Sequence, residues 1–166
     1  IFNNAYMMTG THHLYNYLPT KHEKWLTMIK QEIIDSGLII DILNAKTMEA
    51  VFRLLQGCSF LGSFLAYQYT IDMNYSPYIN FSENDFVKAG IGAIRGIKKC
   101  FLCYGNKCED AIWYVKEHFN DLLKRYGYTS FHPLPGHEPT LIDLQNCFCE
   151  TDKYLRAKMP ELRIGN

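Results

Sequence analysis

The stretch Phe60-Leu-Gly-Ser-Phe-Leu-Ala-Tyr-Gln-Tyr-Thr-Ile71 is apolar on nearly every side when it is drawn as a helix. A helix at the surface of a protein carries one apolar stripe, whereas a helix that is apolar all round is surrounded by other elements. The small residues Gly62, Ser63 and Ala66 allow those neighbours to approach closely. The stretch therefore predicts a central, closely packed helix.

Further helices are predicted on both sides of this segment, because apolar residues recur at helical spacing. The predicted helices cover residues 23–34, 47–57, 108–126 and 140–158. Residues 38–43 form a short β-branched run that fits a strand or a buried turn equally well. No internal repeat, low-complexity tract or long linker interrupts the pattern. We expect residues 1–166 to form one compact all-α domain that is part of a longer polypeptide.

Composition limits the classes of function. The chain has 17 Lys and Arg against 17 Asp and Glu, and 48% of its residues are hydrophobic. A protein that binds polyanions through bulk charge is therefore excluded, and any nucleic-acid site has to be focal. No run reaches the roughly 18 apolar residues of a membrane-spanning helix. We expect an intracellular protein with no membrane partner, nuclear if its source is eukaryotic.

The six cysteines are even in number, but no secretory signal precedes them, so free thiols are favoured over a disulfide framework. A metal site at Cys100-Phe-Leu-Cys103 and Cys108 would need Cys147 or Cys149 as a further ligand, and these two fall on different faces of a predicted helix. We expect no metal and no cofactor. The chain also lacks a Gly-x4-Gly-Lys-Ser/Thr phosphate loop and a Gly-x-Ser-x-Gly elbow, which argues against a complete kinase or a serine hydrolase.

The most informative local pattern is Phe86-Val-Lys-Ala-Gly-Ile-Gly-Ala-Ile-Arg-Gly-Ile-Lys-Lys99. Ser82, followed by Glu83 and Asp85, is typical of the N-cap and acidic first turn of a helix. A helix that leads into a glycine turn and out into a second helix resembles a helix-hairpin-helix, whose second helix binds a nucleic-acid phosphate at its start. The alternative is two packed helices with a solvated basic face. The residues predicted to bind DNA are Gly90, Ile91, Gly92, Arg95, Lys98 and Lys99.

A second pattern is Asp143-Leu-Gln-Asn-Cys-Phe-Cys-Glu-Thr-Asp-Lys-Tyr-Leu-Arg156. Its Glu150 and Lys153 fall roughly on one face of the predicted helix. A carboxylate beside an amine in a cleft transfers protons or holds a phosphate, while the alternative is an ordinary Glu–Lys pair on a helix surface. Gln68 and Asp72, at the end of the central helix, are candidates for the same cleft.

Three blocks of the chain carry a family resemblance through their order and spacing. They are Phe60-Leu-Gly-Ser-Phe-Leu-Ala-Tyr-Gln68 with Asp72-Met-Asn-Tyr75, then Ala89-Gly-Ile-Gly-Ala-Ile-Arg-Gly96, then Cys149-Glu-Thr-Asp-Lys-Tyr-Leu-Arg156. The chain resembles the all-helical domains of alpha-glutamyl/putrescinyl thymine pyrophosphorylases and of hydroxymethyluracil DNA kinases, which belong to thymine hypermodification systems. The resemblance covers roughly residues 55–156 and implies a DNA-glycosylase-like helical fold.

The resemblance also implies an activity, either as a base-modifying transferase or as the DNA-recognition domain of one. The transferase would act on an activated hydroxymethyluracil-type base, adding an amine and releasing pyrophosphate, and chemistry on a duplex base generally needs that base extruded. The implied catalytic residues are Gln68, Asp72, Glu150 and Lys153, and the implied base-stacking residues are Tyr67, Tyr75 and Tyr154. The alternative function is a noncatalytic helical scaffold or protein-interaction module in a larger assembly.

Overall fold

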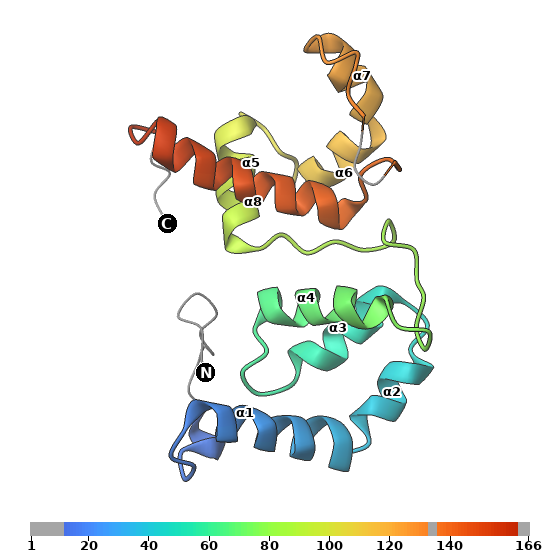
Figure 1. Ribbon diagram of the computed structural model, residues 1–166, viewed down its shortest axis with the longest axis vertical. Coiled ribbons are helices and arrows are strands. Elements are labelled where there is room, and N and C mark those ends of the chain that lie inside the picture. Colours follow the sequence, from blue (N-terminus) through green and yellow to red (C-terminus); the bar gives the residue numbers. More distant parts are fainter. Residues whose placement is uncertain (1–11, 133–135, 163–166) are drawn as a thin grey trace. The chain divides into compact units, whose positions relative to one another are not determined.

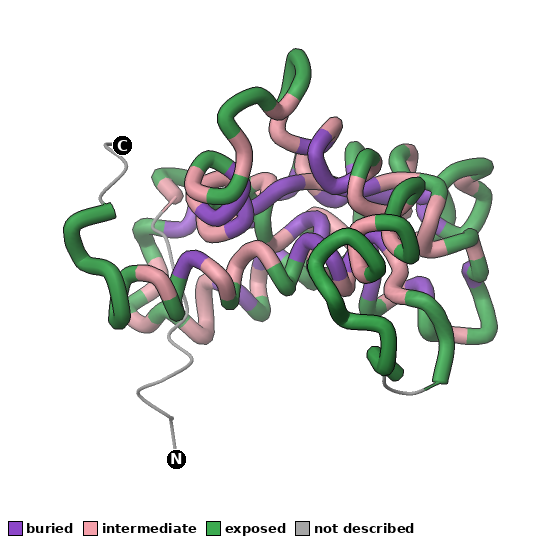
Figure 2. The backbone as a smooth tube through the Cα atoms, turned by 90° about the horizontal axis from the view of Figure 1, so that it is seen from above, coloured by how far each residue is buried: buried purple, intermediate pink, exposed green. Residues whose placement is uncertain are grey.

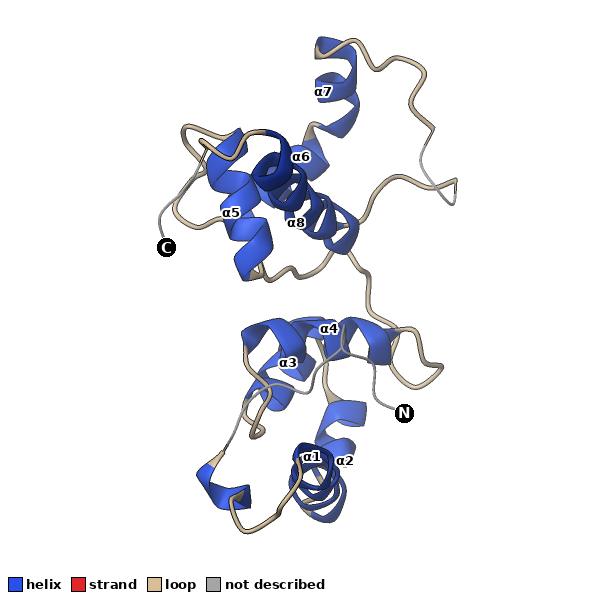
Figure 3. Cartoon of the chain, turned by 60° about the vertical axis from the view of Figure 1, so that its left-hand side comes forward, coloured by secondary structure: helices blue, strands red, loops and turns tan. Residues whose placement is uncertain are grey.

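The computed structural model describes residues 12–132 and 136–162 of the chain. These residues form helices and connecting segments with no strand among them, which confirms the all-α fold class (Figure 3). Contacts between Cα atoms divide the chain into two compact units, unit 1 with residues 1–81 and unit 2 with residues 82–166. Each unit is described by itself. Within the described ranges, no helix is long and apolar enough to cross a membrane.

Unit 1 contains five helical elements after the short η1 (Figure 1). In chain order the elements are η1 (His13–Tyr15), α1 (Lys21–Met28), the π-helix η2 (Ile29–Asp35), α2 (Leu38–Asn44), α3 (Met48–Gln56) and α4 (Ser63–Asn74). The start of α1 has a capping box, in which Thr20 accepts a hydrogen bond from Glu23 N and the Glu23 carboxylate accepts one from Thr20 N. Similarly, Thr47 caps α3 by accepting a hydrogen bond from Ala50 N.

Two elements of unit 1 differ from the sequence predictions. The strand or turn predicted at residues 38–43 is helix α2, because Gly37 adopts a left-handed conformation (φ 81°) and Ser36 Oγ accepts a hydrogen bond from Leu38 N at the start of the new helix. Helix α4 has one buried side, with Ala66, Tyr67 and Ile71, while Phe64 is exposed. Buried and exposed residues alternate in this way along the helical turns of the chain (Figure 2). The apolar stretch is therefore not buried all round as predicted.

Glu32, in the π-helix η2, holds the segment that leads into α4 by hydrogen bonds. The Tyr15 hydroxyl donates a hydrogen bond to Glu32 Oε1 and the Ser59 N–H donates one to Oε2, each at 2.6 Å. Burial acts to raise the pKa of Glu32, but these hydrogen bonds outweigh it, so the pKa lies below its usual value. The next residue, Phe60, has a φ of 66°, and its ring stacks on Trp25 with centroids 5.5 Å apart.

The described residues of unit 2 form four α-helices (Figure 1). They are α5 (Ile91–Cys100), α6 (Glu109–Glu117), α7 (Phe119–Arg125) and α8 (Leu141–Lys158). Thr140 and Asp143 form a capping box at the start of α8, which confirms the predicted helix from Thr140 to Lys158. The single helix predicted for residues 108–126 is wrong, because the backbone breaks at His118 (φ −110°, ψ 18°). Beyond the break, the Phe119 ring packs edge to face on Phe131.

The helix predicted from Ser82 is also wrong, so the first helix of the predicted hairpin is absent from the described residues. Ser82 instead closes a local turn, in which its Oγ accepts a hydrogen bond from Asn84 N and its carbonyl accepts one from Asp85 N. Further along, the backbone N–H of Ala89 donates to the Glu109 side chain, which is distant in sequence. Tertiary partners therefore replace the hydrogen bonds that a helix would have supplied.

Candidate nucleic-acid interface

Helices α5 and α8 cross at very close range (Figures 1 and 3). A Cβ atom at Gly96 would lie 2.1 Å from the carbonyl oxygen of Phe148, and a Cβ atom at Gly92 would lie 2.9 Å from Cys149 Sγ. Neither position has room for a side chain. The glycine pattern that predicted a phosphate-binding hairpin thus serves helix packing, and it brings together two of the blocks that carry the family resemblance.

The start of α5 is held by buried side chains from α6 and α8. The Gly90 N–H donates to Gln145 Oε1 at 3.2 Å, while Lys88 Nζ donates to Glu109 Oε1 at 2.7 Å. Burial acts to raise the pKa of Glu109, but the hydrogen bonds from Lys88 and the Ala89 N–H outweigh it and lower the pKa. The N-terminus of α5 therefore has a fixed position within unit 2.

Lys99, predicted to bind DNA, lies in the contact between α5 and α8. Its amine donates to Asp152 Oδ1 at 2.8 Å, and the two side chains are only 4% and 2% exposed. Arg156 contacts the second carboxylate oxygen at 3.2 Å and is more than half exposed. The charge of Lys99 is thus paired and covered inside unit 2.

The other cations of α5 lie on its outer face. Ile91, Arg95 and Lys98 follow one another at helical spacing, so they share one side of the helix. Ile91 is 69% exposed and Lys98 is exposed, whereas Arg95 is partly buried. Gly90 supplies no side-chain cap, and a helix N-terminus carries a partial positive charge. This face therefore presents two basic side chains close to the positive end of a helix.

Glu150, Lys153 and Tyr154 lie on the exposed side of α8. Lys153 Nζ donates a hydrogen bond to Glu150 Oε1 at 2.5 Å, with both side chains more than half exposed. This hydrogen bond raises the pKa of Lys153 above its ordinary value, which already lies well above neutral pH. The pair is therefore a surface ion pair that presents one cation and one carboxylate side by side.

The predicted residues of unit 1 lie on α4 and just beyond it. Gln68 and Asp72 are one helical turn apart. Gln68 Nε2 is buried and has no hydrogen-bond partner among the described residues, while Asp72 is exposed. Tyr67 is 1% exposed and belongs to the core, whereas Tyr75 is 67% exposed. The structure thus places Gln68 and Asp72 one turn apart on α4 of unit 1, and it joins Glu150 and Lys153 in an ion pair on α8 of unit 2.

All six cysteines are free thiols. Burial raises the pKa of the Cys100, Cys108, Cys147 and Cys149 thiols, which disfavours the thiolate that a metal requires. Across residues 12–132 and 136–162, no three or more His, Cys, Asp or Glu side chains gather in a way that would hold a metal ion.

Three buried polar residues, one half-buried carboxylate and a pocket were not predicted from the sequence. The buried polar residues are Glu109, Gln145 and Asp152, and the half-buried carboxylate is Glu32. Gln145 had a readable signal, since it is a polar residue at an apolar position of the predicted helix. The pocket depends on the break at His118, which the continuous helical pattern concealed; there, the sequence does contain Asn120 and Asp121, residue types favoured at helix starts.

Fold and geometry together define an all-helical protein with a focal cationic helix face, a candidate interface for nucleic acid. A family model described as "5-hmdU DNA kinase, helical domain" matches residues 1–164. The chain therefore belongs to this family, which confirms the resemblance seen in the three sequence blocks and places the chain in the context of DNA hypermodification. No curated protein and no solved structure matches the chain.

Proposed function

We propose that this chain is a DNA-recognition domain that binds duplex DNA at a hydroxymethyluracil-type base. The observation that carries the proposal is the outer face of α5, where Ile91, Arg95 and Lys98 share one side of the helix. Membership of the 5-hmdU DNA kinase helical family supplies the type of base.

Phosphate binding at this face follows from general helix chemistry. Backbone N–H groups at a helix N-terminus and the helix macrodipole both favour an anion. Arg95 adds a guanidinium that forms paired hydrogen bonds with phosphate oxygens, and Lys98 adds a point charge. Lys99 stays in its buried pair with Asp152 and makes no phosphate contact. Two cations on one face give focal contacts, as a chain of zero net charge requires.

Recognition of the base draws on the residues of α4. The unused Nε2 of Gln68 is a donor suited to a carbonyl oxygen of a uracil-type ring. A buried donor without a partner is unfavourable, and a ligand that accepts its hydrogen bond removes that penalty. The exposed ring of Tyr75, which directly follows α4 in unit 1, offers a surface on which a base stacks. Tyr154 offers a second exposed ring on α8, within unit 2.

The catalytic form of the proposal is transfer of an amine to an activated base. The amine nitrogen attacks the methylene carbon of the pyrophosphorylated hydroxymethyluracil, the carbon–oxygen bond breaks, and pyrophosphate leaves with the bonding electrons. The proton lost from the amine passes to a carboxylate, for which Asp72 and Glu150 are the candidates. Lys153, a cation at neutral pH, pairs with the departing pyrophosphate.

The experiment measures binding to duplexes that contain thymine, hydroxymethyluracil or its pyrophosphorylated form, at two salt concentrations. We expect tighter binding to the modified duplexes. Arg95→Gln and Lys98→Gln are each expected to reduce the slope of log K against log salt by about one. Lys124→Gln, which removes the same charge from an exposed position on α7, is the matched control and is expected to change nothing.

Mass spectrometry of the bases after incubation with an amino acid or a diamine tests the catalytic form, which predicts a new adduct on the modified base. Equal affinity for all three duplexes would contradict recognition of the modified base. Absence of binding to any duplex would overturn the proposal and favour the scaffold alternative. The scaffold predicts a stable protein complex that Glu150→Gln and Lys153→Met leave intact.

A further inference from the structure

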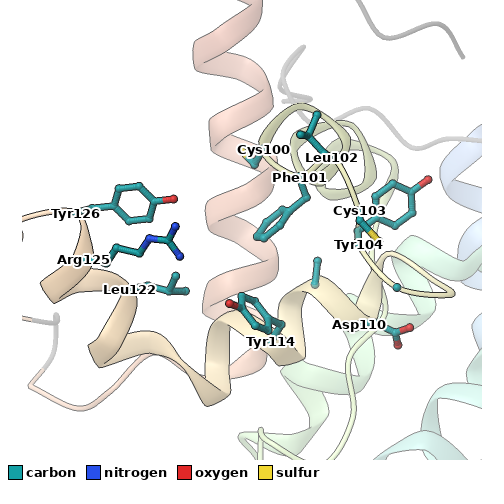
Figure 4. A pocket seen from close by; sticks show the side chains of 12 residues that line it. Cys100, Phe101, Leu102, Cys103, Tyr104, Asp110, Tyr114, Leu122, Arg125 and Tyr126 are labelled. Carbon is teal, nitrogen blue, oxygen red and sulfur yellow. The ribbon is translucent and has the colours of Figure 1, made fainter.

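Unit 2 contains a pocket of about 600 Å³ on the side where α6 and α7 diverge (Figure 4). Its wall is built from the segment after α5, from α6 and from α7. Pockets for small organic ligands have volumes of this order and combine aromatic walls with a few polar groups. The outer face of α5, with Ile91, Arg95 and Lys98, does not line this pocket.

Aromatic rings form the middle of the pocket. Phe101 is fixed by edge-to-face contacts with Tyr114, at a centroid distance of 6.5 Å, and with Phe148 of α8, at 6.0 Å. Figure 4 shows Arg125 and Tyr126 extending from α7 toward Phe101 and Tyr114. A planar ring entering this space would lie against aromatic surfaces that are already held in place.

Opposite charges lie at the two sides of these rings (Figure 4). Arg125 is exposed, and no carboxylate of the described residues is within ion-pair distance of it. Asp110 Oδ2 accepts hydrogen bonds from Asn106 N and Lys107 N, whereas Oδ1 accepts none from the described part of the chain. Arg125 Cζ lies 6.0 Å from the centroid of the Tyr126 ring. The pocket therefore offers a cation without a carboxylate partner at one side and an unused acceptor at the other.

We propose that this pocket binds a nucleotide unit, with its base against Phe101 and Tyr114, its phosphate at Arg125 and a base amino group donating to Asp110. A guanidinium matches the geometry of phosphate oxygens, and a free carboxylate oxygen accepts from an exocyclic amine. An aliphatic anion would leave the rings unused, and an uncharged aromatic molecule would leave Arg125 unpaired. The nucleotide comes either from solution or from the end of a DNA strand, since both offer the same groups.

The test is calorimetric titration of the full chain with deoxyadenosine monophosphate, with deoxyadenosine, and with a single-stranded oligonucleotide that has a 5′-phosphorylated adenine. We expect saturable binding of the monophosphate, and about tenfold weaker binding of deoxyadenosine, which lacks the charge-assisted contact. Arg125→Gln is expected to weaken the monophosphate about tenfold while leaving deoxyadenosine unchanged. Lys124→Gln, the neighbouring exposed cation on α7, is the matched control.

The outcomes distinguish a nucleotide in solution from the end of a DNA strand, and they test the proposal itself. Binding of the free monophosphate assigns the pocket to soluble nucleotides, and binding of the oligonucleotide alone, with the same dependence on Arg125, assigns it to a strand end. No saturable binding of either overturns the proposal, as does an equal loss in Arg125→Gln and Lys124→Gln. The test does not depend on Arg95 or Lys98, so it fails independently of the proposed DNA-recognition function.

Discussion

The side-chain amide nitrogen of Gln68 lacks a hydrogen-bond partner among the described residues, and a bound ligand would supply one. This Nε2 is buried, and such a donor lowers stability by about 1–3 kcal/mol. We expect Gln68→Met, which keeps the shape and removes the donor, to maintain or raise the free energy of unfolding while weakening binding to the modified duplex. Urea denaturation and the duplex titration measure the two effects on the same protein.

Thr70→Val is the matched control on the same helix. Thr70 is fully buried, and its hydroxyl donates to the carbonyl of Ala66 at 2.8 Å. Removal of this satisfied hydrogen bond is expected to lower the free energy of unfolding by about 1 kcal/mol and leave DNA binding unchanged. If Gln68→Met instead resembled Thr70→Val in both measurements, Gln68 would be a structural residue.

The pair of Lys99 and Asp152 is expected to behave as a unit. Lys99→Met leaves Asp152 buried with only the half-exposed Arg156 as a counter-ion, so we expect a loss of about 3 kcal/mol in the free energy of unfolding. The double substitution Lys99→Met with Asp152→Leu removes both charges and is expected to recover most of that loss. A double-mutant cycle by urea denaturation measures the coupling, and additive losses would show that the two side chains do not interact.

At the scale of elements, the close crossing of α5 and α8 depends on Gly96. Alanine favours a helix over glycine by about 1 kcal/mol, so propensity alone predicts that Gly96→Ala is stabilising. The new Cβ would lie 2.1 Å from the Phe148 carbonyl oxygen, which requires the two helices to separate. We therefore expect Gly96→Ala to lower the free energy of unfolding by about 2–3 kcal/mol, measured by thermal and urea denaturation.

Gly62→Ala is the control for this substitution. A Cβ at Gly62 meets no atom within 4 Å, and its φ of −66° is open to any residue. We expect a change of about 0.5 kcal/mol or less. A Gly96→Ala variant as stable as Gly62→Ala would contradict the close approach of α5 and α8.

The elements that sequence patterns predicted well are those whose ends carry local signals. Thr140 and Asp143 form a capping box within one turn, and the Thr47 side chain accepts a hydrogen bond from Ala50 N at the start of α3, so both helix starts are visible in the sequence. Ser82 carries a similar signal but begins no helix. In the segment that follows Ser82, the Ala89 N–H donates a hydrogen bond to Glu109, which lies 20 positions further along the chain. No local sequence pattern indicates so distant a partner.

At the scale of the whole molecule, the sequence predicted the fold class and family but only part of the candidate site. The order of three blocks was sufficient for the family, and two of these blocks do pack together in unit 2. The roles inside the blocks depend on tertiary contacts. Spacing alone did not separate the outward Lys98 from the neighbouring Lys99, which pairs with a carboxylate 53 positions away. The pocket at Arg125 likewise exists only because the chain breaks at His118.

Each unit contains one carboxylate that binds a backbone N–H group of a distant segment, Glu32 in unit 1 and Glu109 in unit 2. The pKa of each lies below its usual value, so the unfolded chain binds more protons than the folded chain in mildly acidic solution. The stability that each contributes is complete above the unfolded pKa of about 4.3 and is lost as the pH falls through the lower folded pKa. We therefore expect both units to become less stable below about pH 4.5.

Urea denaturation between neutral and acidic pH measures this dependence. Glu32→Gln and Glu109→Gln are each expected to lower the free energy of unfolding at neutral pH by about 1–3 kcal/mol, because the amide no longer provides a charged acceptor. Each variant should also lose less stability on acidification than the parent chain, since one of the groups that link folding to pH has been removed. Glu117→Gln, at an exposed position on α6, is expected to change neither quantity. An unchanged acid dependence in both test variants would mean that other carboxylates control the acid transition.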